Sequence, residues 1–427
     1  MLRYATSCVL ALIALLTISI GAPLRAENWP QYRGPAGQGQ AADSGLPTTW
    51  GGKDNENILW KSPLPHTVSN AKPDLNQSSP IVWGDRIFVA TCSWPDKATQ
   101  KEPPEQHVTC YAAADGKQLW DVLVPPGPWL LTDLRGGYGA PTPCTDGERL
   151  YVAFGSATLA ALNCADGTIL WRHDFANYKD IDVAFASSPI LYQDTVVLLC
   201  DKNNKASTLT AYDRKAGDVK WEQKRPTVVF DHTTPVLVKV KDQPQLLIAA
   251  SNALQAADPA SGEILWSCQA KGDVPSPVYD GKLVYIDSGR GGPGFAVDPT
   301  GSGDVTATNI KWKVPNLPEG LSSPVLSGEW LYRMHNPGVL RCINMTTGEE
   351  SFSQRLDGAS TQASPFATPD ALVYFASAGK SYVLKAGPKY EVVATNDLND
   401  GSAASAAVAN GKIYLKGRAS LWCVGKK

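Results

Sequence analysis

Short apolar runs recur along the chain, separated by turns rich in Gly, Pro, Asp and Asn. One copy begins with SSPIVWGDRIFVA (78–90) and leads to CYAAADGKQLW (110–120), in which a Trp follows the turn Gly by four positions. The same order returns in TPCTDGERLYVAFG (142–155) with ALNCADGTILW (161–171). Apolar runs of this length, bounded by turn residues, predict antiparallel β-strands and an all-β protein.

The copies follow one another at a regular period. Their first strands begin after prolines at positions 80, 143, 189, 235, 277, 324 and 365, and Ala406 holds that place in the eighth copy. After a long first interval, the spacing is 41 to 47 residues. Four short strands fit into such a period, which is typical of one β-propeller blade. The pattern therefore predicts eight blades.

The eighth copy runs from SAAVANGKIYL (405–415) into SLWCVG (420–425) and supplies only three strands. The segment ENILWKSPLP (56–65) looks like the missing outer strand. We therefore predict an all-β fold, an eight-bladed antiparallel β-propeller (56–427) closed by an N-terminal strand that completes the last blade. Closure removes the free sheet edges that otherwise recruit other chains.

An aromatic residue occupies the same place in successive outer strands. We predict that these side chains dock each blade on its neighbour, because a large flat ring buries much surface; the alternative is a platform for a cofactor or a sugar. The set is Trp60, Trp120, Trp171, Trp221, Trp266, Trp312 and Phe352.

The first 26 residues have a basic start, an apolar centre and small residues before position 26. They predict a signal peptide, with an uncleaved anchor as the alternative. Residues 27–55 are expected to be an extended N-terminal segment pinned across the propeller. With a net charge of −2 and no basic run, the chain is not expected to bind nucleic acid. We expect no transmembrane span after cleavage, and a periplasmic or secreted protein.

Cysteines outside the predicted signal peptide raise the question of disulfides, since an exported protein meets an oxidising environment. Cys110, Cys342 and Cys423 fall where other copies have Ala, so we interpret them as small buried apolar residues. Cys92 and Cys110 flank one predicted hairpin and are the pair considered for a bridge; their redox state is left open.

The segment A-x-D-x-x-G-x-x-x-W is similar to the tryptophan-docking motif of PQQ-like propellers, and CYAAADGKQLW carries it. One branch of that family implies a dehydrogenase with pyrroloquinoline quinone and a metal ion over the axis. Another implies a non-enzymatic scaffold for assembly of the bacterial envelope. The chain lacks the adjacent Cys-Cys pair that resemblance to the alcohol dehydrogenases implies, so it is more similar to the scaffold branch.

Two groups of residues are candidates for a binding surface. The insertion VPPGPWLLTDLRGGYGA (124–140) offers aromatic and Arg side chains, which are typical interface anchors; a lid over the channel is the alternative. Polar residues just before the first strand of several blades are expected to ring the channel, where carboxylates could hold Ca²⁺ or a basic peptide; solvated loops are the alternative. The candidates are Trp129, Arg135, Tyr138, Asp182, Asp231, His232, Asp273, Glu319 and Gln362.

Other motifs carry less chemistry. GRGGPG (289–294) has the form of a dinucleotide loop but leads into a predicted strand, so a hairpin loop is expected. The five His stand at no metal-binding spacing. We therefore predict a non-catalytic binding or scaffolding platform with a protein partner in the bacterial envelope and no cofactor. The alternatives are a dehydrogenase using PQQ with Ca²⁺, and a polysaccharide hydrolase or lyase.

Overall fold

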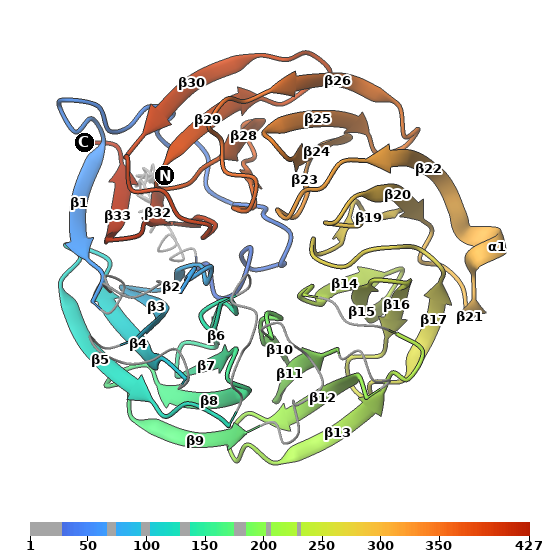
Figure 1. Ribbon diagram of the computed structural model, residues 1–427, viewed down its shortest axis with the longest axis horizontal. Helices are drawn as coiled ribbons and strands as arrows, with labels where there is room; N and C mark the ends of the chain where they lie inside the picture. Colours follow the sequence, from blue (N-terminus) through green and yellow to red (C-terminus); the bar gives the residue numbers. More distant parts are fainter. Residues whose placement is uncertain are drawn as a thin grey trace, which may run out of the picture.

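The chain forms eight sheets arranged as a ring around a central axis (Figure 1). The computed structural model describes residues 28–65, 74–94, 103–128, 137–174, 185–201, 206–228 and 232–427. The predicted eight-bladed propeller is confirmed. The predicted signal peptide (1–26) lies outside the described residues.

Each blade is an antiparallel sheet whose first strand is nearest the axis. Blade 1 contains β2 (Ile81–Trp83), β3 (Arg86–Ser93), β4 (Glu105–Ala112) and β5 (Gln118–Val124), and blade 2 contains β6 (Cys144–Thr145), β7 (Arg149–Phe154), β8 (Thr158–Asn163) and β9 (Ile169–Asp174). Blade 3 contains β10 (Ile190–Tyr192), β11 (Thr195–Cys200), β12 (Thr208–Asp213) and β13 (Val219–Lys224), and blade 4 contains β14 (Val236–Val240), β15 (Gln243–Ala250), β16 (Ala253–Ala257) and β17 (Ile264–Cys268).

Blades 5 to 8 follow the same order, and β1 completes the last. Blade 5 contains β18 (Val278–Tyr279), β19 (Val284–Asp287), β20 (Gly292–Val297) and β22 (Ile310–Leu317), and blade 6 contains β23 (Val325–Ser327), β24 (Trp330–His335), β25 (Val339–Asn344) and β26 (Glu350–Arg355). Blade 7 contains β27 (Phe366–Ala367), β28 (Leu372–Phe375), β29 (Lys380–Lys385) and β30 (Val392–Asp397), and blade 8 contains β31 (Ala407–Ala409), β32 (Lys412–Lys416), β33 (Ser420–Gly425) and β1 (Ile58–Pro63). We call the face where first strands begin the upper face.

The ring closes as the sequence predicts. Strand β1 pairs antiparallel with β33, with Trp60 opposite Cys423 and Pro63 opposite Ser420. In Figure 1 the blue β1 lies outside the red β33 and β32. The two ends of the chain therefore share one sheet, and neither end can leave blade 8 without breaking this pairing.

The outer-strand aromatics lie against the turn of the next blade. Trp120 donates its indole N–H to the carbonyl of Cys164 at 3.2 Å, and Trp171 repeats this contact on Arg214 at 3.1 Å. A Cβ at Gly167 would lie 2.8 Å from Trp120, in a backbone with φ of +78°. The turn therefore requires Gly for both its conformation and the close approach of the ring. Trp266 differs, since it is buried and donates to Gln245 within its own blade.

A closed belt of hydrogen bonds surrounds the axis. In each blade the residue before the first-strand Pro, or before Ala406, donates its backbone N–H to the hydroxyl oxygen of the corresponding residue in the next blade, at 2.9 to 3.1 Å. The last bond, from Ser405 to Ser79, joins blade 8 to blade 1. The members of the belt are Ser79, Thr142, Ser188, Thr234, Ser276, Ser323, Ser364 and Ser405.

The segment before β1 crosses the ring, and its blue trace runs through the centre of Figure 1. Trp29 exchanges two backbone hydrogen bonds with Val82, on the inner strand of blade 1. Farther along, Gln40 forms a parallel bridge with Ala367 of blade 7. Trp29 is 2% exposed. This segment therefore closes the channel below the hydroxyl belt.

All eight cysteines of the described residues are free and buried. The bridge considered between Cys92 and Cys110 is not formed. Cys92 lies opposite Gln106 and Cys110 opposite Phe88, so the two are offset by four pairs, about 13 Å along the hairpin. A disulfide needs Cα atoms within about 7 Å. Burial raises the pKa of the Cys110 thiol to about 12, so it stays protonated at neutral pH.

The GRGGPG segment leads into strand β20, as expected, and opens no helix. One short helix, α1 (Thr306–Asn309), occurs among the described residues and leads into β22. Just before it, the two-residue strand β21 (Gly303–Asp304) pairs parallel with β17 and adds a fifth strand to blade 4. In the described part of the chain, no helix is long and apolar enough to cross a membrane.

Candidate functional site

The upper end of the axial channel is an open cavity of about 210 Å³, which we call the channel mouth. Its floor is formed by the hydroxyl belt together with Tyr32, whose hydroxyl lies 3.1 Å from Ser364 Oγ. Around the floor stand polar side chains from several blades. They are Gln77, His232, Arg290, Glu319 and Gln362.

The structure brings three of the predicted rim residues to this cavity, namely His232, Glu319 and Gln362. Asp273 is used elsewhere: it is 6% exposed, accepts the N–H of Gly289 at 3.0 Å and pairs with Arg290 at 3.2 Å. It therefore holds the loop between β19 and β20 in place.

The predicted contact residue Tyr138 is also inside the protein. It is 1% exposed, and its ring lies 5.7 Å from that of Trp94 in an edge-on arrangement. Four further candidates lie outside the described residues: Trp129, Arg135, Asp182 and Asp231.

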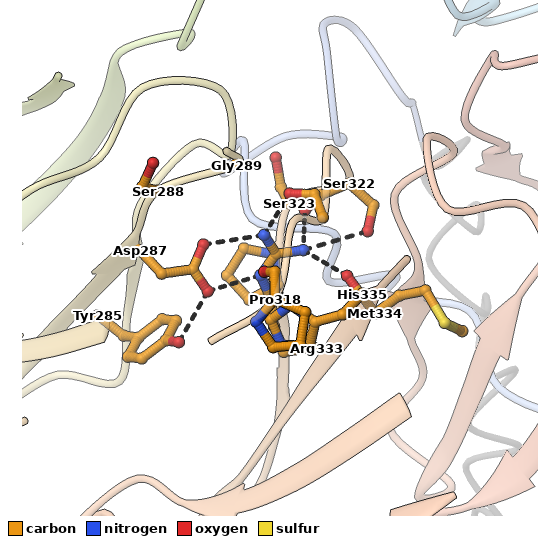
Figure 2. Close-up of polar contacts among 12 residues, drawn as sticks. Tyr285, Asp287, Ser288, Gly289, Pro318, Ser322, Ser323, Arg333, Met334 and His335 are labelled. Carbon is orange, nitrogen blue, oxygen red and sulfur yellow. Dashed lines mark hydrogen bonds and ion pairs between the residues drawn. The ribbon is translucent and has the colours of Figure 1, made fainter. Parts of the chain in front are cut away.

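A buried network fixes the loop that carries Glu319 to the channel mouth (Figure 2). Arg333, on β24, faces Asp287, on β19, through two contacts of 2.7 and 2.9 Å, and both side chains are fully buried. Arg333 also donates to the carbonyl of Ser322 at 2.6 Å and to that of Gly320. Because one guanidinium satisfies a carboxylate and two loop carbonyls, it ties blade 5 to blade 6 beside the channel.

His335 completes this network from below the loop. Its Nδ1 lies 3.0 Å from the carbonyl of Pro318. Burial has the largest effect on the pKa of His335 and the nearby charge of Arg333 adds to it, and together they lower this pKa to about 4. The ring is therefore neutral at pH 7, and because a carbonyl only accepts, Nδ1 carries the proton. This position holds the loop rather than transferring protons.

A second buried network, built on Lys416 and Asp74, lies between blade 8 and blade 1. Lys416 Nζ donates to the carbonyls of Ser78 at 2.8 Å and Ala90 at 3.0 Å. Burial lowers its pKa to about 7, partly countered by Cys92 and Asp74. Burial raises the pKa of Asp74, although backbone N–H groups such as that of Asn76 oppose this. These charges lie at the junction where the ring closes.

A metal-dependent quinone at the channel mouth would need a cation site there. Carboxylate and His ligands must converge to hold a cation. Among residues the structure describes, no group of three or more His, Cys, Asp or Glu side chains is placed to hold a metal ion. The described mouth offers amides, hydroxyls, His232, Glu319, and Arg290 paired with Asp273. Because His232 and Glu319 form no cation site with further ligands among the described residues, the mouth does not fit a quinone–metal pair.

Sequence reasoning missed the hydroxyl belt. The Ser/Thr-Pro pair was visible in most copies, and it begins each repeat. Its role depends on the distance between neighbouring blades, which a single repeat does not contain. The sequence signal for the belt was a Ser or Thr hydroxyl that recurs before the first strand of each blade, at a position where Ala would also fit by size.

The blade architecture, the docking tryptophans and the closing strand define a PQQ-like β-propeller. Residues 104–354 match the family PQQ_2, described as outer membrane protein assembly factor BamB, and the chain belongs to this family. The resemblance to PQQ-like propellers, on the scaffold side, is thereby confirmed.

Relatives and solved structures agree with this placement. The chain is 24% identical over 379 residues to outer membrane protein assembly factor BamB of Escherichia coli (strain K12), covering 77% of this chain and 92% of that protein. It resembles the structure of BamB from Moraxella catarrhalis with a TM-score of 0.60 at 14% identity, covering 86% and 96% of the two chains. A europium-containing methanol dehydrogenase has a TM-score of 0.67 at 11% identity, over 91% and 89%. These structural likenesses establish the fold alone.

Proposed function

We propose that this protein is a non-catalytic scaffold of the bacterial envelope that takes part in assembling outer membrane proteins. The family match carries this proposal, since the family and the Escherichia coli relative are both described as outer membrane protein assembly factors. The relative is similar over nearly its whole length. We propose a periplasmic location, with protein partners and no cofactor.

The geometry favours binding on the upper face. The N-terminal segment occupies the lower part of the channel, where Trp29 is bridged to Val82. The upper face, by contrast, carries the open channel mouth and the longer loops between blades. Loops on a rigid ring are suited to recognition, because the sheets fix the loop ends while the loops vary.

Trp129 and Arg135, which lie outside the described residues, remain candidate contact residues in this proposal. Substituting Trp129→Ala together with Arg135→Ala is expected to weaken partner capture without lowering the melting temperature. A fall of many degrees in the melting temperature would instead support a lid that packs over the channel.

The scaffold role is tested by deleting the protein in its host and measuring folded outer membrane proteins in purified outer membranes. We expect their levels to fall and to recover with the wild-type protein. Purification of the tagged protein after mild cross-linking should yield envelope proteins. Unchanged outer membrane protein levels, with no envelope partner cross-linked, would overturn the proposal.

A further inference from the structure

A second and larger cavity lies on the upper face over blades 7 and 8. It has a volume of about 500 Å³ and is formed by the loops after β26, β28, β30 and β32, together with residues 74–76. It shares Gln362 and Ala403 with the channel mouth, so the two cavities adjoin. We call it the blade 7–8 groove. Its volume lies in the range of about 300–1,000 Å³ that is typical of ligand sites.

Glycines keep the groove open. A Cβ at Gly379 would lie 3.2 Å from the Cα of Gly401, so the two loops meet backbone to backbone. A Cβ at Gly401 meets no atom closer than 3.7 Å, which leaves free space on its groove side. The groove is also lined by Ser360, Ser377 and Ser402. These groups suit the polar backbone of an extended chain.

The nearby carboxylates are already satisfied by N–H donors. Asp74 accepts from the backbone of Asn76 at 2.8 Å and of Gly139 at 3.2 Å. Asp400, beside the groove, accepts from the backbone of Ala419 at 2.9 Å and from the indole of Trp422 at 2.9 Å. Their negative charge is therefore directed into the protein rather than toward the groove.

Two cations on the groove are not balanced in this way. Lys380 and Arg418 both line it, and within the described residues neither forms an ion pair. Lys380 Nζ lies 5.6 Å from the ring of Tyr382, which is a weak contact. Leu75, also on the groove, is 41% exposed. The groove thus combines positive charge, hydroxyls and one apolar patch.

We propose that the blade 7–8 groove binds an extended, acidic peptide segment of a partner protein, whose carboxylates pair with Lys380 and Arg418. Charge-assisted bonds to a carboxylate are the strongest that these side chains can make. The size of the groove and the adjoining channel mouth favour a peptide over a small acid, because a small acid would leave Leu75 and the serines uncovered. The inference deepens the proposed function and rests on it only for the identity of the partner.

The test is fluorescence anisotropy on the purified protein with a short labelled peptide of Leu, Ser and Glu, and with its Gln counterpart. We expect the Glu peptide to bind more tightly. Lys380→Gln with Arg418→Gln should weaken it about tenfold, which corresponds to about 1.4 kcal/mol for the loss of two exposed ion pairs. Gly401→Leu should also weaken binding, because it fills the groove without changing charge.

Lys117→Gln with Lys215→Gln is the matched control. Both residues are exposed, and they lie in turns between third and fourth strands, at the opposite end of the blades from the groove. The control variant should bind as the wild type does. Equal loss in both double variants would mean non-specific charge attraction and overturn the proposal.

Two further outcomes would also overturn it. Glutarate that displaces the peptide at the peptide's own dissociation constant would show a small-acid site. Absence of binding by either peptide would leave the groove without this role. Neither result affects the host deletion experiment, so failure of the groove and failure of the scaffold role are distinguishable.

Discussion

The hydroxyl belt gives a prediction that isolates one hydrogen bond between blades. Thr234 is 5% exposed, and its hydroxyl accepts the backbone N–H of Ser188 at 3.0 Å. Thr234→Val keeps the shape of the side chain but leaves that buried N–H without a partner. An unsatisfied buried donor costs about 1–3 kcal/mol. We therefore expect the free energy of unfolding to fall by that amount.

Equilibrium unfolding in urea, followed by tryptophan fluorescence, measures this change. With an m-value of about 3 kcal/mol/M, the midpoint should fall by about 0.3–1 M at unchanged slope. Thr91→Val is the matched control, because Thr91 is fully buried in β3 and its hydroxyl has no hydrogen-bond partner among the described residues. That variant should be neutral or stabilising. Equal effects of the two substitutions would refute a stabilising role for the belt.

Three other predictions follow from the closure and from the buried charges. Deleting residues 1–65 should expose the edge of β33 and give associating protein by light scattering; a monomer that melts cooperatively would contradict the closure. Arg333→Met should lower the free energy of unfolding, measured in urea, by about 3–5 kcal/mol, because it leaves the buried Asp287 carboxylate without its partner. Adding Asp287→Asn should recover part of this loss; no recovery would mean that lost packing dominates. The pKa of His335 falls from about 6.5 when unfolded to about 4 when folded. The unfolded chain thus binds more protons between these values, and stability due to His335, complete above about pH 6.5, is lost toward pH 4 by about 1.4 kcal/mol per pH unit. His335→Asn should flatten this pH dependence, and an unchanged slope would show that other groups cause it.

The sequence predicted local features best. The period, the Gly turns and the placement of ENILWKSPLP gave the eight blades and the closing strand, because each repeat must bury its faces against its neighbours. It also aligned Cys110 and Cys423 with the Ala slot, which the registers with Trp120 and Trp60 bear out. Because such features recur in each blade, the sequence of one copy helps to assign the same feature in the others.

Single-copy features were harder to predict. Asp273 follows the same local pattern as Glu319, yet one is buried in a loop contact and the other lines the channel mouth. The sequence left Tyr138 open between an interface anchor and part of a lid, and the structure places its ring against Trp94. Which way such a side chain points depends on loops from other blades, and the short-range pattern holds no information about them.

The sequence by itself therefore determined the ring, its blade number and the strand that closes it. These follow from periodicity and from the need to pair every strand edge. Only the tertiary structure decided which polar groups meet: the belt from Ser79 to Ser405, the pairing of Arg333 with Asp287, and the groove bearing Lys380 and Arg418. These contacts join residues from different blades, and their distances exist only once the ring has closed.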